Sequence, residues 1–196
     1  MDARKQYNTV TANEVIDGRH PPVIMPMVAK DDQGIIPLGC VLAKDSDGKI
    51  VPYAVVTADM TGLVNGTNKA FTHTATAIPL QPNSVVVTHG EITLQDNGFG
   101  VIGGTGGSGT VNYKTGAVAV TFTDAPADES ASPEVVVARA VVGIATRSAD
   151  TSKEDVISVL IHGTALKELV VIGVGASVLT TGANDALAKL GIYTTF

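Results

Sequence analysis

Tryptophan is missing from this 196-residue sequence, aromatic residues make up only 4% of it, and charged residues make up only 16%. Thirteen Lys and Arg residues stand against nineteen Asp and Glu residues, which gives a formal net charge of −6. A chain with so few cations offers no basic surface for nucleic acid or for an anionic membrane. We therefore expect no nucleic acid and no membrane among its partners.

Long apolar runs and pairs of cysteines are also missing. No stretch reaches the roughly 18 apolar residues of a membrane-spanning helix, and the first twenty residues contain no apolar segment of the signal-peptide type. The single cysteine, Cys40, excludes an internal disulfide, and its apolar neighbours predict a buried small residue rather than a catalytic thiol. These features favour a chain that is made in the cytoplasm.

The residues that dominate are Val, Thr, Ala and Gly, in short apolar or alternating runs that are separated by turn residues. Apolar residues make up 44% of the chain, which is enough for a core. This pattern predicts a mainly β fold with a minor α contribution. One short helix of little more than one turn is expected near the C-terminus, with Asn184 or Asp185 as its N-cap and Gly191 as the residue that follows it.

Composition divides the chain into four regions. Residues 1–20 are polar and aperiodic and end at consecutive prolines, which predicts an extended arm with little that can join a core. Residues 21–60 contain short strands with turns at 31–34 and 45–48, and their prolines favour edge positions. Residues 61–139 alternate Thr and Val and predict an inserted β-sandwich module. Residues 140–196 return to the pattern of the second region.

The segment from Gly104 to Gly109 reads GTGGSG and fits the G-x-G-x-x-G spacing of a dinucleotide-binding loop. In such a loop a helix follows the glycines, and its N-terminal amides hold the phosphates. Here residues 110–122 predict a strand, a tight turn and another strand. The segment is therefore interpreted as a glycine turn or a strand-edge bulge, and no cofactor is expected.

The histidines do not predict a metal site. None of His20, His73, His89 and His162 lies two or four residues from another histidine or from Cys40. His73 and His89 both fall in the inserted module, where strand pairing can make them face each other. No serine, histidine and carboxylate set with a nucleophile elbow is visible, although such triads are defined by geometry rather than by sequence. We expect no metal and no enzymatic activity.

Three segments carry a resemblance to a known family. They read IIPLGCVLAKDSDGKIVPYAV at 35–55, VVGIATRSADTSKEDVISVLIHGTAL at 141–166 and DALAKLGIYTTF at 185–196. Together and in this order they resemble the lambda-type bacteriophage head decoration protein family, with VLIHG as the most specific element. The departure is an insertion of roughly eighty residues between Ala58 and Val141, where small members have only a few.

The resemblance implies a structural virion protein. Members of that family are small β-rich folds that form trimers, occupy the outside of the icosahedral head at local three-fold positions, and reinforce the head after it expands. For this chain the resemblance implies a homotrimer, the major capsid protein as partner, and a location on the capsid exterior after synthesis in the host cytoplasm. The N-terminal arm of such proteins contacts the capsid.

Two sets of candidate contact residues follow. In the arm, the few side chains able to bury area against a capsid are Tyr7, Val10, Val15 and Ile16. The alternative for the arm is an unstructured terminus with no task. At the C-terminus, the apolar stretch is too long for the short helix to bury alone, which predicts an oligomer interface at Leu187, Leu190, Ile192, Tyr193 and Phe196.

Two other functions stay open at the level of sequence. The inserted module, displayed on a trimer, can bind a host glycan or surface protein through exposed aromatic side chains. Its aromatic residues are Phe71, Phe99, Tyr113 and Phe122, of which Tyr113 and Phe122 fall at alternating core positions. A hydrolase fused to a β-module is the other alternative, and it requires a cleft in which histidine and carboxylate side chains converge.

Overall fold

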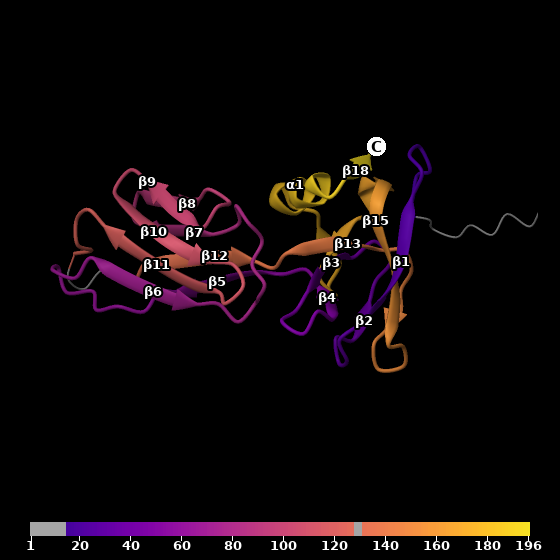
Figure 1. Cartoon of the computed structure of the whole chain (residues 1–196), viewed down its shortest axis with the longest axis horizontal. Coiled ribbons are helices and arrows are strands. Elements are labelled where there is room, and N and C mark those ends of the chain that lie inside the picture. Colours follow the sequence, from indigo (N-terminus) through magenta and orange to yellow (C-terminus); the bar gives the residue numbers. More distant parts are fainter. Residues whose placement is uncertain (1–14, 128–130) are drawn as a thin grey trace, which may run out of the picture.

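The computed structural model describes residues 15–127 and 131–196. Strands dominate and one short α-helix lies near the C-terminus, which confirms the predicted mainly β fold with a minor helical part. Figure 1 shows two β-rich units that lie end to end along the longest axis of the molecule. One unit contains the start of the described chain and the C-terminus, and the other is inserted into it.

The first of these, which we call the base unit, is built on a six-stranded sheet. In spatial order its strands are β1 (Val23–Val28), β15 (Val156–Leu166), β13 (Val141–Ala145), β3 (Val41–Lys44) and β4 (Ile50–Pro52), and β18 (Ile192–Thr195) also pairs with β15. Only the pairing of β15 with β18 is parallel.

Two small sheets and a single-turn helix complete the base unit. β2 (Ile35–Ile36) pairs with β14 (Ala149–Asp150), and β16 (Val171–Ile172) pairs with β17 (Ser177–Val178). The 3-10 helix η1 (Lys167–Leu169) connects β15 to β16. These pieces cover parts of the main sheet that its own strands leave open.

The turn predicted at 45–48 joins β3 to β4 as a hairpin. The Asp45 carboxylate accepts hydrogen bonds from the backbone N–H groups of Asp47 (3.0 Å) and Lys49 (2.9 Å), and Lys30 Nζ lies 3.0 Å from it. Burial by itself raises the pKa of Asp45, but these bonds outweigh it and lower the pKa overall. Gly48 adopts a φ of +79°, which favours glycine.

Apolar side chains fill both faces of the base sheet. On one face α1 (Thr181–Lys189) packs against β13 and β18, and the cluster there includes Val15, Val41, Ile144, Leu160, Leu187 and Ile192. On the other face the cluster includes Ile36, Cys40, Leu42, Ile157 and Val159. Cys40 is fully buried, which confirms the prediction made from its neighbours.

The second unit, which we call the insert, is one eight-stranded antiparallel sheet. Its strands in spatial order are β5 (Val55–Asp59), β12 (Glu134–Ala138), β7 (Val86–His89), β8 (Ile92–Asp96), β9 (Val101–Gly104), β10 (Gly107–Asn112), β11 (Ala117–Phe122) and β6 (Ala70–Thr74). Thr61, just after β5, and Thr72 of β6 exchange two backbone hydrogen bonds of 2.7 and 3.0 Å. The sheet therefore closes on itself, where a sandwich of two sheets was predicted.

Alternation along the strands decides which side chains enter the core of the insert. In β11 the buried residues are Val118, Val120 and Phe122, and the residues between them are exposed, which confirms the predicted alternation. Phe71 of β6 packs edge-on against Phe122, with the ring centroids 5.8 Å apart. These aromatic rings lie in a core that is separate from the two clusters of the base unit.

The structure moves one predicted boundary. We expected the second region to end at residue 60, but β5 pairs with β12 and belongs to the insert. The apolar run that includes β4 and β5 shows no change of composition where it passes from one unit to the other, and the polar residues after Asp59 form a loop inside the insert. The insert therefore spans residues 55–138.

The C-terminal helix is longer than predicted and begins earlier. Its N-cap is Thr180, whose hydroxyl accepts a hydrogen bond of 3.4 Å from the Ala183 N–H, and nine helical residues follow. Gly182 in the first turn is a poor helix former, and it hid the start of the helix in the sequence. Gly191 follows the C-cap with a φ of +79°, which confirms its predicted place.

The insert is expected to be removable. Val55 and Ala138 are direct antiparallel partners, so the Cα atoms at its two ends lie about 4.5–5.5 Å apart. A short glycine linker in place of residues 55–138 should leave a base unit that unfolds cooperatively, and residues 54–139 alone should also fold. Circular dichroism during heating and the dispersion of amide signals in NMR spectra measure both. Two unfolded pieces would contradict the division into two units.

Candidate binding surfaces

The arm predicted from the sequence is anchored at its C-terminal end. Val15 is buried, and its carbonyl accepts a hydrogen bond of 2.7 Å from a backbone N–H of β15. Ile16 forms a bridge to the same strand, and the Asp17 N–H donates to a β15 carbonyl over 3.3 Å. Residues 15–17 therefore add a short piece of strand to β15, and we call this piece the arm root.

The Asp17 carboxylate links the arm root to two strands of the base unit. Its oxygens accept hydrogen bonds from the hydroxyls of Thr164 in β15 and Thr195 in β18, and Arg19 Nε lies 3.4 Å away. The side chain is only 4% exposed. These hydrogen bonds, with that from Thr164 contributing most, lower the pKa of Asp17 to about 2. Asp17 therefore stays charged at neutral pH.

The arm root corrects two of the four predicted capsid contacts. Val15 is 1% exposed and Ile16 is half-buried, because both pack against the core of the base unit. Neither side chain is free to bury area on a partner. A strand of two or three residues has no measurable period, so their burial could not be predicted from the sequence pattern. The other two predicted contacts, Tyr7 and Val10, lie outside the described residues.

The five residues predicted as an oligomer interface separate into two groups. Leu187 and Ile192 are completely buried, because α1 packs this side against β13 and β18 within the same chain, so they are not interface residues. Leu190, Tyr193 and Phe196 have exposed fractions of 40%, 53% and 89%. We call these three exposed residues the C-terminal surface.

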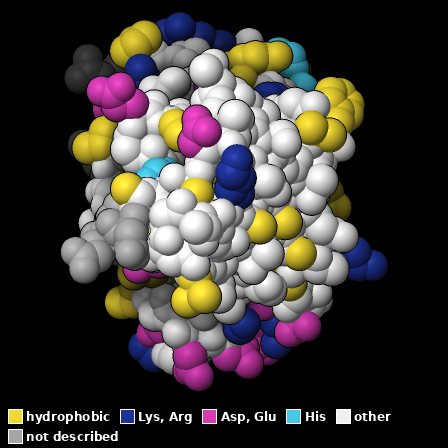
Figure 2. All heavy atoms as spheres, turned by 90° about the vertical axis from the view of Figure 1, so that its left-hand side faces the viewer, with side chains coloured by type: hydrophobic (Ala, Val, Ile, Leu, Met, Phe, Trp, Pro, Cys, Tyr) yellow, Lys and Arg dark blue, Asp and Glu magenta, His cyan; other side chains and the backbone are white. Residues whose placement is uncertain are grey.

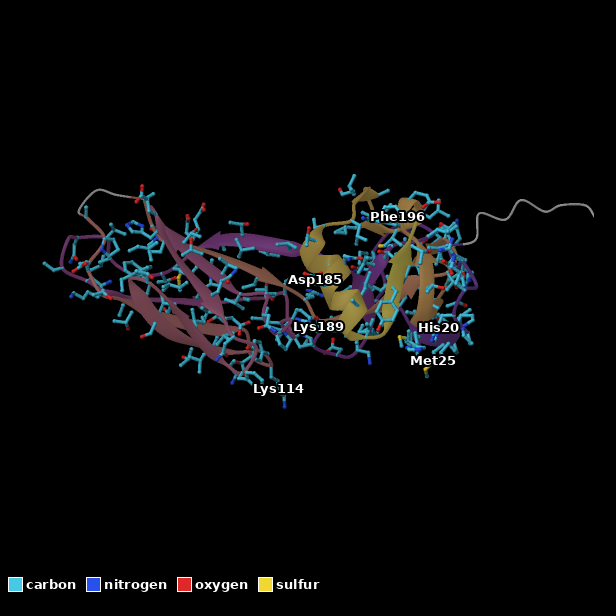
Figure 3. The ribbon with its side chains drawn as sticks, turned by 90° about the horizontal axis from the view of Figure 1, so that it is seen from above. His20, Met25, Lys114, Asp185, Lys189 and Phe196 are labelled. Atoms are coloured by element: carbon cyan, nitrogen blue, oxygen red, sulfur yellow. The ribbon has the colours of Figure 1, made fainter. Side chains whose placement is uncertain are left out.

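Two cations hold the end of the C-terminal surface in place. The ammonium of Lys167 lies 4.6 Å from the centroid of the Phe196 ring, which is within the range of a cation–π contact. Arg19 Nη2 donates a hydrogen bond of 3.5 Å to the Phe196 carbonyl oxygen. In Figure 3, Phe196 lies on one side of the base unit, and His20 and Met25 lie on the other.

A second exposed apolar surface lies on β1, and the candidate residues taken from the sequence did not include it. Val23, Ile24, Met25 and Val28 are between 45% and 54% exposed, and because side chains alternate along a strand, Met25 lies on one face of β1 while Ile24 and Val28 lie on the other. The sequence does carry a signal for it, since all six residues of VIMPMV are uncharged and Pro26 favours an edge strand. Among the described residues β1 pairs along its length with β15 alone, which fits an edge strand, and directly after it Ala29 forms a bridge to Ile50 of β4.

The glycine-rich segment forms part of a hairpin: the turn is confined to residues 105 and 106, and Gly107 and Gly109 lie within β10. β9 ends at Gly104, β10 begins at Gly107, and β11 follows without a helix between them. A Cβ atom on Gly109 would come within 2.2 Å of the carbonyl oxygen of Ala119 in β11. The close approach of two backbones explains a glycine at this position, and no phosphate needs to be invoked.

The histidines form two ring contacts that were not predicted, one of them between His89 and Phe122, whose ring centroids lie 5.9 Å apart. His73 and His89 lie on β6 and β7, which are not neighbours in the sheet, so they do not face each other across strands. His20 and His162 meet edge-on, with their ring centroids 4.9 Å apart. Within residues 15–127 and 131–196, no three His, Cys, Asp or Glu side chains are grouped so that they could hold a metal ion.

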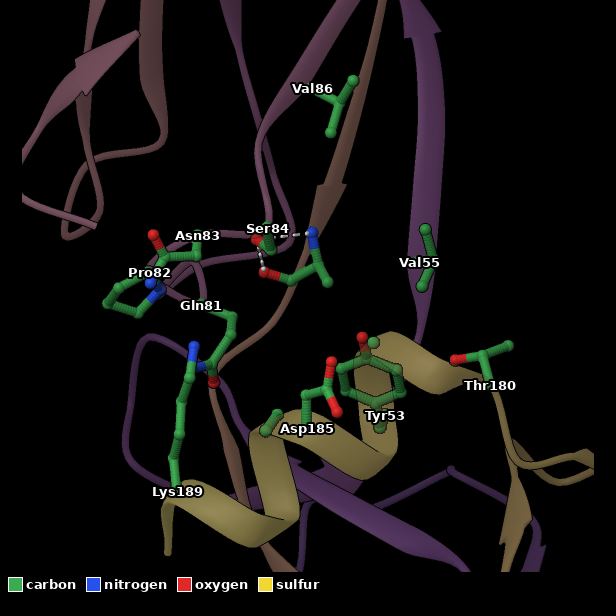
Figure 4. Close-up of a pocket in the computed structure, with 13 residues that line it drawn as sticks. Tyr53, Val55, Gln81, Pro82, Asn83, Ser84, Val86, Thr180, Asp185 and Lys189 are labelled. Atoms are coloured by element: carbon green, nitrogen blue, oxygen red, sulfur yellow. Dashed lines mark hydrogen bonds between the residues drawn. The ribbon is translucent and has the colours of Figure 1, made fainter. Parts of the chain in front are cut away.

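A cleft of about 340 Å³ lies where the two units meet. Figure 4 shows its walls, which include Tyr53 of the base unit, Asp185 and Lys189 of α1, and the loop of the insert that contains Gln81. The Gln81 Oε1 atom accepts a hydrogen bond of 3.0 Å from the Val141 N–H and so connects the units. The lining residues include Ser84, Asp185 and Lys189 but no histidine or cysteine.

The free end of the insert is mostly polar and uncharged. Figure 2 looks at this end and shows hydrophobic side chains scattered over the visible face. Of the four aromatic residues of the insert, Phe71 and Phe122 are buried, and the Tyr113 hydroxyl donates a hydrogen bond to Asp96. Phe99 alone is largely solvent-accessible, at 90%.

No protein-family model, no curated protein and no solved structure matches this chain. Among the described residues, no helix has the length and apolar character needed to cross a membrane. A function therefore has to be inferred from the sequence resemblance and from the surfaces of the chain itself.

Replacing Asp17 with Asn should lower the melting temperature at neutral pH, because the amide cannot replace a carboxylate that accepts two hydroxyl bonds. A carboxyl group whose folded pKa lies below its ordinary 3.8 contributes stability above that value and loses it as the pH falls toward about 2. The difference between wild type and D17N should therefore shrink over this range. Differential scanning calorimetry at a series of pH values measures it.

The matched control for D17N is D185N, since Asp185 is exposed and takes part in none of the ion pairs among the described residues. D185N should melt close to wild type at every pH. A D17N deficit that is equally large at pH 7 and at pH 2 would show that the charge of Asp17 is not what stabilises the arm root.

Replacing a buried or an exposed C-terminal residue with alanine should change the free energy of unfolding by different amounts. Leu187→Ala leaves a cavity in the core and should lower the free energy of unfolding by about 2–5 kcal/mol. Tyr193→Ala removes an exposed side chain and should change it by no more than about 0.5 kcal/mol. Urea unfolding of the monomeric protein at low concentration gives both values. Equal losses for the two variants would contradict the burial described above.

Proposed function

We propose that this chain is a structural virion protein that binds the outside of an expanded bacteriophage head as a homotrimer at local three-fold positions and stabilises the shell. One observation carries the proposal. The three segments that resemble the decoration protein family, at 35–55, 141–166 and 185–196, fold together into the base unit. The chain leaves the base unit at Val55 and returns to it after Ala138, and these two residues are direct strand partners. The insert therefore does not interrupt the main sheet of the base unit.

The arrangement of the molecule supports an orientation on the head. The arm root and the C-terminus belong to the base unit, and the insert extends from the opposite side of that unit (Figure 1). An arm bound to the capsid would therefore leave the insert directed into solvent. The insert contains seven Asp and Glu residues and two Lys residues, a net charge of −5, so nearly all of the net charge of −6 would lie away from the shell.

The arm supplies the attachment in this proposal, and the major capsid protein is its partner. Fourteen residues precede the arm root, and a fully extended segment of this length reaches up to roughly 50 Å. Ordering such a segment costs about 1–2 kcal/mol per residue, so hydrogen bonds from strands of the shell have to add to the apolar area of Tyr7 and Val10. Attachment then depends on the surface that the expanded shell presents.

Stabilisation of the shell follows because binding and shell assembly are linked equilibria. A protein that binds the expanded shell and not its separated subunits shifts the equilibrium toward the intact shell by its binding free energy. Each copy can be weak because many copies act together. The chain needs no catalytic group for this task, and it acts from the capsid exterior after synthesis in the host cytoplasm.

A displayed binding module remains the second candidate function, and Phe99 is the observation that favours it. This side chain stands at the turn between β8 and β9 and is largely exposed. Glycan-binding surfaces stack sugars on such rings, but a single ring is a small platform. The role is compatible with attachment to a head and does not replace it.

Deleting residues 2–14 should leave the fold and the oligomeric state unchanged and greatly weaken attachment to expanded heads. The deletion stops before Val15, because Val15 and Asp17 belong to the base unit. Heads that lack the protein are mixed with wild-type or truncated protein and sedimented, and gel densitometry gives the occupancy. Occupancy of the truncated protein at the wild-type level would mean that the arm does not attach the protein.

A finer comparison uses the full-length chain. The double variant Tyr7→Ala/Val10→Ala should bind heads more weakly than the control Asn8→Ala/Asn13→Ala, because only the first removes apolar area from the arm. Equal occupancy of the two variants would place the contact elsewhere in the arm.

A further inference from the structure

The cleft between the two units contains a buried polar group without a partner. Tyr53 lines the cleft and is only 4% exposed, and its hydroxyl forms no hydrogen bond with residues 15–127 or 131–196. Figure 4 shows this hydroxyl directed toward the insert side of the cleft. Burial raises the pKa of Tyr53, so the hydroxyl keeps its proton at neutral pH and is able to donate. Water or a ligand therefore has to supply the missing partner.

The surroundings of this hydroxyl are apolar. Tyr53, Ala138 and Ala186 are all buried where they line the cleft, and we call the part between them its floor. Val55, the strand partner of Ala138, and Val86 line the cleft beside the floor. A charged group placed there would lose its water without gaining an opposite charge. The part of a ligand that reaches the floor therefore has to combine uncharged polar groups with C–H surface.

Polar groups of several kinds stand around the floor. Asp185 and Lys189 lie one turn apart on α1, and neither forms an ion pair within the described residues. On the insert side, the Asn83 amide and the Gln81 Nε2 group form no hydrogen bond within those residues, whereas the Ser84 hydroxyl is already bonded to backbone atoms. The cleft thus offers a carboxylate that only accepts, an ammonium that only donates, and amide groups.

An uncharged sugar matches this combination. Each sugar hydroxyl both donates and accepts, so neighbouring hydroxyls can bond to Asp185, Lys189 and Tyr53 while the C–H groups between them cover the floor. An amino acid brings charges that suit Asp185 and Lys189, but its apolar side chain would leave the Tyr53 hydroxyl unpaired. An acidic sugar would be repelled by the insert, whose net charge is −5.

The size and walls of the cleft favour a compact ligand. Its volume of about 340 Å³ is near the lower end of the range for small-molecule sites. The chain passes between the units twice, and Tyr53, Val55 and Ala138 of these two connections form one wall. An extended polypeptide needs a groove that is open at both ends, so a ring-shaped ligand fits this wedge better.

Phe99, the largely exposed ring of the insert, stands beside the rim of the cleft. It directly follows Gly98, and a Cβ atom on Gly98 would come within 2.7 Å of the side-chain amide of Asn83. The β8–β9 turn that contains both residues is at the end of the insert next to the base unit, because Gln95 just before it is the strand partner of Val86. A second sugar unit, linked to one in the cleft, can therefore stack on the Phe99 ring.

We propose that the cleft between the base unit and the insert binds a neutral hexopyranose, with sugar hydroxyls bonded to the Tyr53 hydroxyl, the Asp185 carboxylate and the Asn83 amide. The ring of the sugar covers the floor, and a further unit of a glycan chain extends toward Phe99. The proposal gives the second candidate function a defined site. It does not depend on attachment to heads, since none of these residues belongs to the arm.

Titration of the full-length, isotope-labelled protein with sugars tests the site. The probes are the methyl pyranosides of glucose, galactose, mannose and N-acetylglucosamine, and each is followed by amide chemical shifts in NMR spectra. At least one of them should shift the amide signals of residues 53–55, 81–86 and 180–189 in a saturable way. Glucuronate and leucine, which carry charges, should leave these signals unchanged.

Two variants with matched controls measure the contacts. Tyr53→Phe keeps the buried ring and removes the hydroxyl, so it should fold normally and bind the sugar about 3- to 10-fold more weakly. Asp185→Ala should weaken binding at least about tenfold. Their controls are Tyr193→Phe and Asp155→Ala, which alter exposed side chains outside the cleft and should bind like wild type.

The Phe99→Ala variant distinguishes a free sugar from the end of a glycan chain. A disaccharide that ends in the preferred sugar should bind more tightly than the methyl glycoside, and Phe99→Ala should remove this gain while leaving the methyl glycoside unaffected. Equal binding of both probes to wild-type protein would indicate a free monosaccharide as the natural ligand of the same cleft.

Several outcomes would overturn the proposal. Unchanged spectra with all four methyl glycosides would remove the sugar site, and shifts confined to the β8–β9 turn would place it outside the cleft. Equal affinities of Tyr53→Phe and Tyr193→Phe would show that the buried hydroxyl takes no part. Saturable shifts with leucine alone would replace the sugar by a zwitterion. All variants should occupy heads at the wild-type level, so these outcomes are independent of the proposed attachment.

Discussion

Backbone pairing along β15 is the interaction on which the base unit depends. One half of this strand pairs with β1 and β13, and the other half pairs with the arm root and β18, so four distant segments meet on it. The partners change at Gly163, whose φ of +129° is rarely adopted by residues with a side chain. Beside it, a Cβ on Gly143 would approach the Leu160 carbonyl oxygen to 2.3 Å, so β13 and β15 require a glycine to lie this close. A base unit held in this way forms as a whole, and both of its chain ends stay beside the same strand.

The insert leaves this pairing undisturbed because it enters and leaves through neighbouring strands. Because its sheet is closed, its outer strands pair with each other within the insert. Its core cluster shares no residue with the two clusters of the base unit. The units are joined by the hydrogen bond of 2.9 Å from the Ala140 N–H to the Pro79 carbonyl, by the bond from the Val141 N–H to Gln81 Oε1, and by Ala138 of the insert, which packs in a cluster of the base unit. A unit attached in this way adds bulk and charge on one side without changing what the base unit presents on the other.

Turns and strand alternation, which depend on neighbouring residues, could be predicted from the sequence. Burial of a side chain by a segment that is distant in the sequence could not. The turn at 45–48, the strand, turn and strand within residues 110–122 and the alternation in β11 depend on residues within a few positions of one another, and all three were predicted correctly. Burial of Leu187 and exposure of Leu190 depend on which side of α1 meets β13 and β18, and β13 is distant in the sequence. Val15 is buried for the same reason, since its partner strand begins 141 residues later. The structure therefore removes Val15, Leu187 and Ile192 from the candidate contact residues, because all three are buried, and it leaves Leu190, Tyr193 and Phe196 exposed.

The arm root also determines how a load on the arm would reach the rest of the protein. Its hydrogen bonds to β15 lie across the direction of the strand, so a pull along the arm loads them together in shear rather than one after another. Asp17 passes part of that load to β18 through Thr195, and β18 also carries Tyr193 of the C-terminal surface. The arm root, β15 and β18 would therefore carry such a load together, because the Asp17 carboxylate connects all three through its bonds to Thr164 and Thr195.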